Sequence, residues 1–219
     1  LENNDIFAHH LGKYISVVIA ANIIQGVVVL PLLLLYKKHS PAKLFKSVYP
    51  ALMTPFFSKS SSATLPLTMD CMIEKHGTKE EIARFALPIC TIINMNGCAA
   101  FIFVTVIYVM QVHSVEINAM TLFAWIFIST IAAIGNAGVP MGCFFLSASL
   151  LSGMNIPINL LGLILPLYSL IDMLETALNV WSDICVTKIV DQKEKMTIDG
   201  KFDESSWQLA VPHDAFYQT

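Results

Sequence analysis

The chain has 219 residues, of which 55% are hydrophobic and only 13% are charged, and its formal net charge is −3. The mean hydropathy of +0.65 is typical of a membrane protein and excludes an ordinary soluble domain. The sequence contains no basic stretch interleaved with aromatic residues and no phosphate-binding loop. We therefore expect no nucleic-acid partner.

The first half of the sequence predicts a membrane span followed by a hairpin. Residues 1–10 are a polar lead-in without a start methionine, so we expect a piece of a longer chain, and residues 11–36 are long and apolar enough to span a bilayer. Residues 41–75 contain two apolar arms, each too short to cross, on either side of the polar stretch "KSSSATLP". Because non-helical backbone at membrane depth must face protein or water, this pattern predicts a re-entrant hairpin.

The second half of the sequence repeats this arrangement. Residues 79–111 form a span interrupted by Pro88 and by "NMNGC", and residues 117–153 form a second predicted hairpin around "NAGVP". Residues 156–190 are the last predicted span, and residues 191–219 are a polar tail.

Lysine placement predicts the orientation of the two hairpins. Lysines and the single arginine gather at both ends of the first predicted hairpin and after the last span, whereas the two ends of the second hairpin carry none. By the positive-inside rule, the first hairpin opens to the cytoplasm and the second to the outside, and the C-terminal tail is cytoplasmic. Hairpins that face opposite sides predict an inverted repeat with a binding site near the midplane. We expect an integral protein of the cell (inner) membrane.

The last span carries an unusual polar stripe. At about 100° per residue its polar side chains share one helix face; they are Asp172, Glu175, Thr176, Asn179 and Asp183. A carboxylate at the centre of a span costs about 2.5 to 3.5 kcal/mol, so three acids favour a functional site over a stripe that merely packs in a bundle.

Other classes of protein also fit single features. An intramembrane serine protease could use Lys59 as a base for a neighbouring serine. An aspartyl protease needs two facing acids, but Asp172 and Asp183 lie about 16 Å apart along one helix. A binding or sensing protein that does not transport is a third alternative. The five cysteines lie singly in apolar surroundings and are interpreted as buried free thiols.

Four stretches together resemble one known family. In chain order "KSSSATLP", "NMNGC", "AIGNAGVP" and "IDMLETALNVWSD" are similar to the signature motifs of the dicarboxylate/amino acid:cation symporters, the glutamate and aspartate transporters. The resemblance implies an all-α membrane protein with about three membrane-spanning helices and two oppositely oriented re-entrant hairpins. It further implies the transport-domain part, the C-terminal half, of an elevator-type transporter rather than an enzyme. Such transporters form a homotrimer through an N-terminal scaffold that this chain lacks.

The resemblance also implies which residues bind substrate and cations. The positions that correspond to substrate contacts are Ser61, Ser62, Cys98, Ala137, Gly138, Val139, Asp172, Glu175, Thr176 and Asn179. Those that correspond to sodium ligands are Asn94, Asn96, Asn179 and Asp183. Asp172 would hold a substrate amino group, Asn179 its carboxylate, and Ala137 to Pro140 would form the gate.

Several positions depart from the family pattern. Asn96 replaces an acidic cation ligand, Cys98 replaces a threonine, and Glu175 replaces the arginine that clamps an acidic side chain. We therefore expect sodium- or proton-coupled symport of a neutral or cationic amino acid. A glutamate/aspartate or dicarboxylate symporter of the usual family type is the alternative, and a truncated protein that binds without transporting is another.

Overall fold

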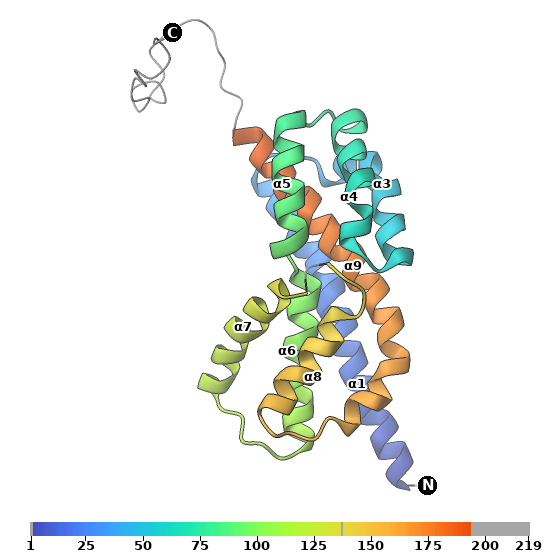
Figure 1. Ribbon diagram of the computed structural model, residues 1–219, viewed down its shortest axis with the longest axis vertical. Coiled ribbons are helices and arrows are strands. Elements are labelled where there is room, and N and C mark those ends of the chain that lie inside the picture. The colour runs from blue at the N-terminus through green and yellow to red at the C-terminus, as the bar shows by residue number, and fades with distance from the viewer. Residues whose placement is uncertain (1, 137, 194–219) are drawn as a thin grey trace, which may run out of the picture.

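The computed structural model describes residues 2–136 and 138–193 (Figure 1). Every regular element in these ranges is a helix. Within the described residues, three helices are long and apolar enough to cross a membrane; they are Leu11–Tyr36, Glu80–Val112 and Asn159–Asp191. The prediction of an all-α membrane protein with about three spans is confirmed. The predicted polar tail lies outside the described residues beyond residue 193.

The molecule is elongated, and α9 (Asn159–Lys193) runs along much of its length with the other helices beside it (Figure 1). In chain order the helices are α1 (Glu2–Ile23), η1 (Ile24–Val29), α2 (Leu30–Tyr36), α3 (Pro41–Ser58), α4 (Ser61–Asp70), η2 (Cys71–Lys75), α5 (Glu80–Ile93), α6 (Asn96–Val112), α7 (Ala119–Ile134), α8 (Gly142–Gly153) and α9 (Asn159–Lys193). The first helix begins at Glu2, so the predicted lead-in is helical from that residue onward.

The first helix pair, α3 and α4, turns sharply at "KSSSATLP". Lys59 ends α3 in the left-handed conformation at φ 55°, and Ser60 caps α4 by accepting the backbone N–H of Ala63 at 3.2 Å. A residue outside the right-handed region followed by a serine cap is a strong helix stop and start. The lysine and the first serine therefore make the break that the sequence predicts.

The second helix pair, α7 and α8, also ends near the middle of the molecule. Asn118 caps α7 by accepting the backbone N–H of Thr121 at 2.8 Å. In the turn between the two helices, Gly138 has φ 69°, which a glycine adopts without strain, and Met141 has φ 60°.

Two hydrophobic cores lie one after the other along the long axis of the molecule. One core is built mainly from α1, α6, α8 and the first half of α9, and the other from α2, α3, η2, α5 and the second half of α9. Between them, α5 gives way to α6 at Asn94 and Met95, whose ψ angles of 60° and 61° are not helical. The turns of both helix pairs reach this middle level, where α9 runs past them (Figure 1). The middle of the molecule therefore brings together three backbone breaks and the polar face of α9.

Gly97 sets how closely α6 approaches α9. A Cβ atom at this position would lie 3.0 Å from Asn22 Oδ1 and 3.2 Å from both the Cα and the carbonyl oxygen of Glu175. Two of these three neighbours are backbone atoms, which cannot move aside as a flexible side chain can.

We predict that Gly97→Val destabilises the protein by about 1 to 3 kcal/mol, the usual range for overpacking a core. Thermal unfolding in detergent, followed by size-exclusion chromatography, measures the effect. Gly162→Ala is the control, because a Cβ there meets no atom within 4 Å. Equal melting temperatures for Gly97→Val and the native protein would contradict close packing at this position.

Candidate functional site

An enclosed polar site lies at the middle level of the molecule. It surrounds a cavity of only about 10 Å³ and is lined by Lys59, Ser61, Met95, Asn136, Gly138, Val139, Cys143, Asp172, Glu175, Thr176 and Asn179. These residues come from the turn of the first pair, the break before α6, the turn of the second pair, and α9. We call this set the central site.

The turns of the two helix pairs touch each other at the central site. The Ser60 hydroxyl donates a hydrogen bond to the Gly138 carbonyl at 3.1 Å. A Cβ on Gly138 would lie 2.7 Å from Ser62 Oγ, so a larger residue would push the turns apart. A cavity this small cannot hold an amino acid unless one turn moves away.

Asp172 connects α9 to the second turn. Its Oδ2 accepts the backbone N–H of Met141 at 3.2 Å, and its Oδ1 accepts the Tyr168 hydroxyl at 3.5 Å. The Thr176 hydroxyl donates to the Asp172 carbonyl at 2.7 Å, which satisfies that hydroxyl within the helix. The carboxylate is therefore held at the edge of the turn that closes the site.

Glu175 is buried with incomplete hydrogen bonding. It is only 1% exposed; Oε2 accepts the Tyr168 hydroxyl at 3.4 Å, whereas Oε1 has no hydrogen-bond partner among the described residues. Asn136 Oδ1, also in the lining of the central site, likewise lacks a partner there. Buried acceptors without donors are costly, so the central site has acceptor positions that a ligand donor would satisfy.

Lys59 supplies the positive charge of the central site. Its ammonium donates to the Ser169 hydroxyl at 3.0 Å. No ion pair joins Lys59 to Glu175 in the described part of the chain. The central site thus holds one ammonium and two carboxylates.

A second polar cluster surrounds Asp183, next to the break before α6. Asp183 accepts hydrogen bonds from the Asn94 amide at 2.9 Å and from the Thr91 hydroxyl at 3.5 Å. Asn94 and Asn96 both donate to the Ser182 hydroxyl, at 2.9 and 2.7 Å. Carboxylate, amide and hydroxyl oxygens are the ligands preferred by small hard cations.

Asn179 joins the central site to this cluster. Its side-chain oxygen accepts the backbone N–H of Gly97 at 2.8 Å, and its amide nitrogen lies 3.5 Å from the sulfur of Met95. The amide therefore holds the first turn of α6 against α9 and lies in the lining of the central site.

Most of the residues predicted for substrate binding are brought together by the fold. Those that line the central site are Ser61, Gly138, Val139, Asp172, Glu175, Thr176 and Asn179. Ser62 and Cys98 do not line it, and Ala137 lies outside the described residues. Sequence analysis missed Tyr168 and Ser182. Tyr168 stands four residues before Asp172 on the same helix face, a spacing that could have revealed it.

The interpretation of all five cysteines as free thiols is wrong for two of them. Cys98 and Cys143 form a disulfide, with Cα atoms 5.4 Å apart, and Cys71, Cys90 and Cys185 are buried free thiols. The pairing joins the start of α6 to the start of α8. The sequence separation of 45 positions between the two cysteines concealed this pairing in the sequence.

Comparison with known proteins identifies the class. Residues 7–193 match the model of the sodium:dicarboxylate symporter family. The neutral amino acid transporter B(0) of Mus musculus and the neutral amino acid transporter A of Homo sapiens are each 36% identical to this chain over 174 residues, or 79% of it. These residues make up 32% and 33% of the two relatives, so the chain spans about a third of their length.

The long apolar helices around a buried polar site indicate an integral membrane protein, and the family match identifies its class. The chain belongs to the sodium:dicarboxylate symporter family, as its four motifs predict. Because the family and these relatives are transporters, the two protease interpretations are excluded.

Contact between the turns can be tested at Ser60. We predict that Ser60→Ala lowers stability more than Ser40→Ala does. Both variants lose an N-cap, worth about 0.5 to 2 kcal/mol, but only the first also loses the bond to Gly138. Thermal unfolding of the two variants measures the difference. Equal losses would mean that the contact between the turns adds nothing.

Proposed function

We propose that the full-length protein is a cation-coupled symporter for a neutral or cationic amino acid, and that the central site binds the substrate. The observation that carries this proposal is the meeting of Asp172, Glu175 and Asn179 with both turns around one enclosed space. A binding site at the junction of broken helices near the midplane is typical of secondary transporters.

In this proposal the two helix pairs are re-entrant hairpins of opposite orientation. The first opens to the cytoplasm, as does the C-terminal tail, and the turn of the second is the outer gate. The small cavity supports a gate, because substrate cannot enter until a turn moves. The chain would be the transport domain of an elevator-type homotrimer in the cell membrane, with an N-terminal scaffold beyond this sequence.

In this proposal the substrate contacts charged groups and a group that lacks a hydrogen-bond partner among the described residues. The Asp172 carboxylate binds the α-amino group, while Asn179 and the hydroxyl and backbone groups of Ser61 and Ser62 bind the α-carboxylate. The N-terminal end of α4 favours an anion there. Glu175 Oε1, which lacks a donor among the described residues, then accepts a hydrogen bond from the substrate side chain.

Charge at Glu175 separates the proposed substrate class from the acidic alternative. A substrate carboxylate about 4 Å from an ionised Glu175 would be repelled by roughly 4 kcal/mol at an effective dielectric near 20, about a thousandfold in affinity. The neutral amino acid transporters among the relatives also support a substrate without an acidic side chain. A glutamate, aspartate or dicarboxylate symporter is the second candidate, supported by the family description.

Cation coupling is proposed to use the cluster around Asp183. Asn94, Asn96, Asn179 and Asp183 would supply oxygen ligands to sodium. Because Asn96 carries no charge, one sodium site is weakened or replaced by proton coupling, with Glu175 as the candidate proton carrier.

Coupling can be tested by removing the carboxylate. We predict that Asp183→Asn abolishes the dependence of uptake on a cation gradient in proteoliposomes of the full-length protein, because it removes the only acid of the cluster. Asp70→Asn makes the same change at an exposed position of α4 and should leave uptake unchanged. Native uptake that ignores both sodium and pH gradients would refute the coupling.

Substrate class can be tested by competition. We predict that serine and alanine compete for uptake more strongly than aspartate or succinate, with cystine and arginine in the same panel to report cationic and larger side chains. Glu175→Gln should then relieve the repulsion and improve aspartate competition by at least tenfold. Glu74→Gln, an exposed change of the same kind, is the control. Tight aspartate binding that Glu175→Gln leaves unchanged would show that Glu175 does not face the substrate side chain.

A further inference from the structure

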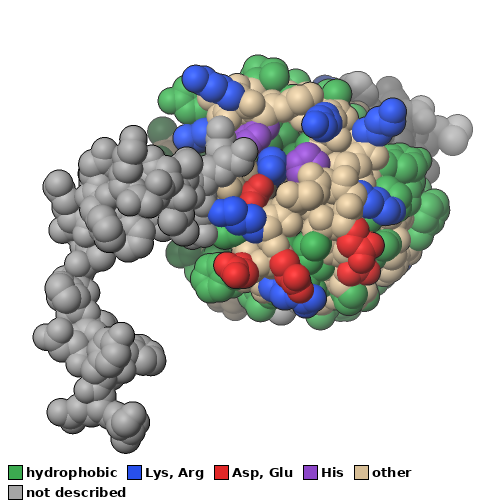
Figure 2. Space-filling view, turned by 90° about the horizontal axis from the view of Figure 1, so that it is seen from above, with side chains coloured by type: hydrophobic (Ala, Val, Ile, Leu, Met, Phe, Trp, Pro, Cys, Tyr) green, Lys and Arg blue, Asp and Glu red, His purple; other side chains and the backbone are tan. Residues whose placement is uncertain are grey.

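A basic pocket lies at the end of the molecule opposite the N-terminus. Its cavity measures about 270 Å³, and its polar lining residues are Lys38, His39, Ser40, Lys43, His76 and Lys188. These come from the loop between α2 and α3, the start of α3, the end of the first helix pair, and the end of α9. Figure 2 shows lysine, arginine and histidine side chains on this end of the molecule, together with several aspartate and glutamate side chains.

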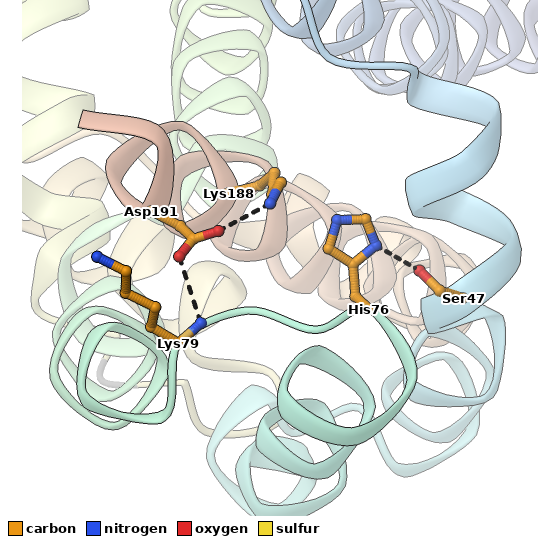
Figure 3. A network of polar contacts seen from close by, with 5 residues as sticks. All are labelled: Ser47, His76, Lys79, Lys188 and Asp191. Carbon is orange, nitrogen blue, oxygen red and sulfur yellow. Dashed lines mark hydrogen bonds and ion pairs between the residues drawn. The ribbon is translucent and has the colours of Figure 1, made fainter. Parts of the chain in front are cut away.

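The charges of the basic pocket are only partly compensated. Lys188 pairs with Asp191 at 2.7 Å, and Asp191 also accepts the backbone N–H of Lys79 at 3.3 Å (Figure 3). No acid forms an ion pair with Lys38 or Lys43 in the part of the chain that the structure describes. Both cations border one cavity, so an anion that enters it meets charge that no carboxylate of the described residues has paired with.

His76 leaves the positive charge of the pocket to the lysines. Burial, followed by the charges of Lys188 and Lys43, lowers the pKa of His76; His39 adds to the effect and Asp191 opposes it. The His76 ring is therefore mainly neutral at pH 7.

The His76 ring is also fixed in place. Its Nδ1 lies 2.9 Å from the Ser47 hydroxyl, which donates to the Leu44 carbonyl at 2.7 Å (Figure 3). One wall of the pocket is thus an anchored ring rather than a mobile side chain.

The surroundings of the basic pocket are those of a membrane interface. The pocket begins directly after the apolar helix Leu11–Tyr36. Leu32, Leu35 and Tyr36 at the end of that helix are 58%, 56% and 79% exposed, as expected of side chains that face lipid. Tyrosine and lysine at the end of a span mark the level of the lipid headgroups.

An apolar cavity adjoins the same turn of helix. It measures about 390 Å³ and is lined by Pro41, Ala42 and Phe45 of α3 and by Trp181 of α9, among others. Ser40 and Lys43, in the same first turn, line the basic pocket. A cationic cavity and an apolar cavity that share one helical turn suit a ligand with an anionic head and an acyl chain.

We propose that the basic pocket binds the phosphate headgroup of an acidic membrane lipid, with an acyl chain in the adjoining apolar cavity. Basic pockets between transmembrane helices are known to bind acidic headgroups, and a lysine near the membrane surface contributes enough for about a fivefold change in affinity. A soluble phosphate ester shares the headgroup chemistry but has no acyl chain to occupy the apolar cavity.

The experiment measures binding of fluorescent phosphatidic acid to the purified full-length protein in phosphatidylcholine nanodiscs. Lys38→Asn/Lys43→Gln removes both unpaired cations, and asparagine tolerates the left-handed conformation of Lys38 at φ 61°. We expect this variant to lose about twenty-five-fold in affinity. Lys37→Gln/Lys46→Gln is the matched control, because it removes the same charge from neighbouring positions outside the pocket lining, and should change affinity less than threefold.

Two further measurements distinguish lipid binding at the pocket from other sources of binding. Ala42→Phe fills the apolar cavity and should weaken phosphatidic acid binding while circular dichroism and elution volume stay unchanged. Soluble glycerol 3-phosphate should compete poorly. Equal losses of affinity in the two double variants would show that the general surface charge, and not the basic pocket, attracts phosphatidic acid. Strong competition by glycerol 3-phosphate, or no effect of Ala42→Phe, would overturn the lipid as ligand.

Discussion

The constraint on which the rest of the structure depends is the polar face of α9 at membrane depth. Three carboxylates and an amide on one apolar helix need hydrogen-bond donors that lipid cannot provide and that the helix itself provides only in part, through the Tyr168 hydroxyl. The other donors come from backbone in a turn or at the start of a helix and from side chains at or near the break before α6. The Met141 N–H bonds to Asp172, the Gly97 N–H bonds to Asn179, and the Asn94 side chain at the break before α6 bonds to Asp183.

The broken helices are therefore a consequence of the polar face as much as a feature of the binding site. Each helix break leaves backbone N–H groups without a helical partner, and α9 carries side-chain oxygens that need donors. Where the two meet, hydrogen bonds between them satisfy both groups. Glu175 is the exception, since one of its oxygens has no donor among the described residues. The fold thus leaves Glu175 Oε1 without a donor among the described residues at the place where the turns of both helix pairs meet.

The two halves of the molecule share this plan but differ at their ends. The pair α3 and α4 packs against the second half of α9, whereas α7 and α8 pack mainly against α6, and each half has its own hydrophobic core. The end formed by α2, α3 and the last turns of α9 carries the lysines and two histidines around a cavity, whereas the other half contains the disulfide between Cys98 and Cys143. One half thus carries a cluster of basic residues at its end, and the other carries a disulfide beside the central site.

The sequence alone determined the helix breaks, the three spans and the family, because each depends on local chemistry. A serine cap, a glycine turn and a run of about 20 apolar residues are readable in order along the chain. Only the tertiary structure decided which side chains meet across it. The role of Ser182 between two asparagines, the cysteine pair and the basic pocket all arise from packing of helices against one another. Such contacts join residues from separate helices or successive turns, and no single stretch of sequence records them.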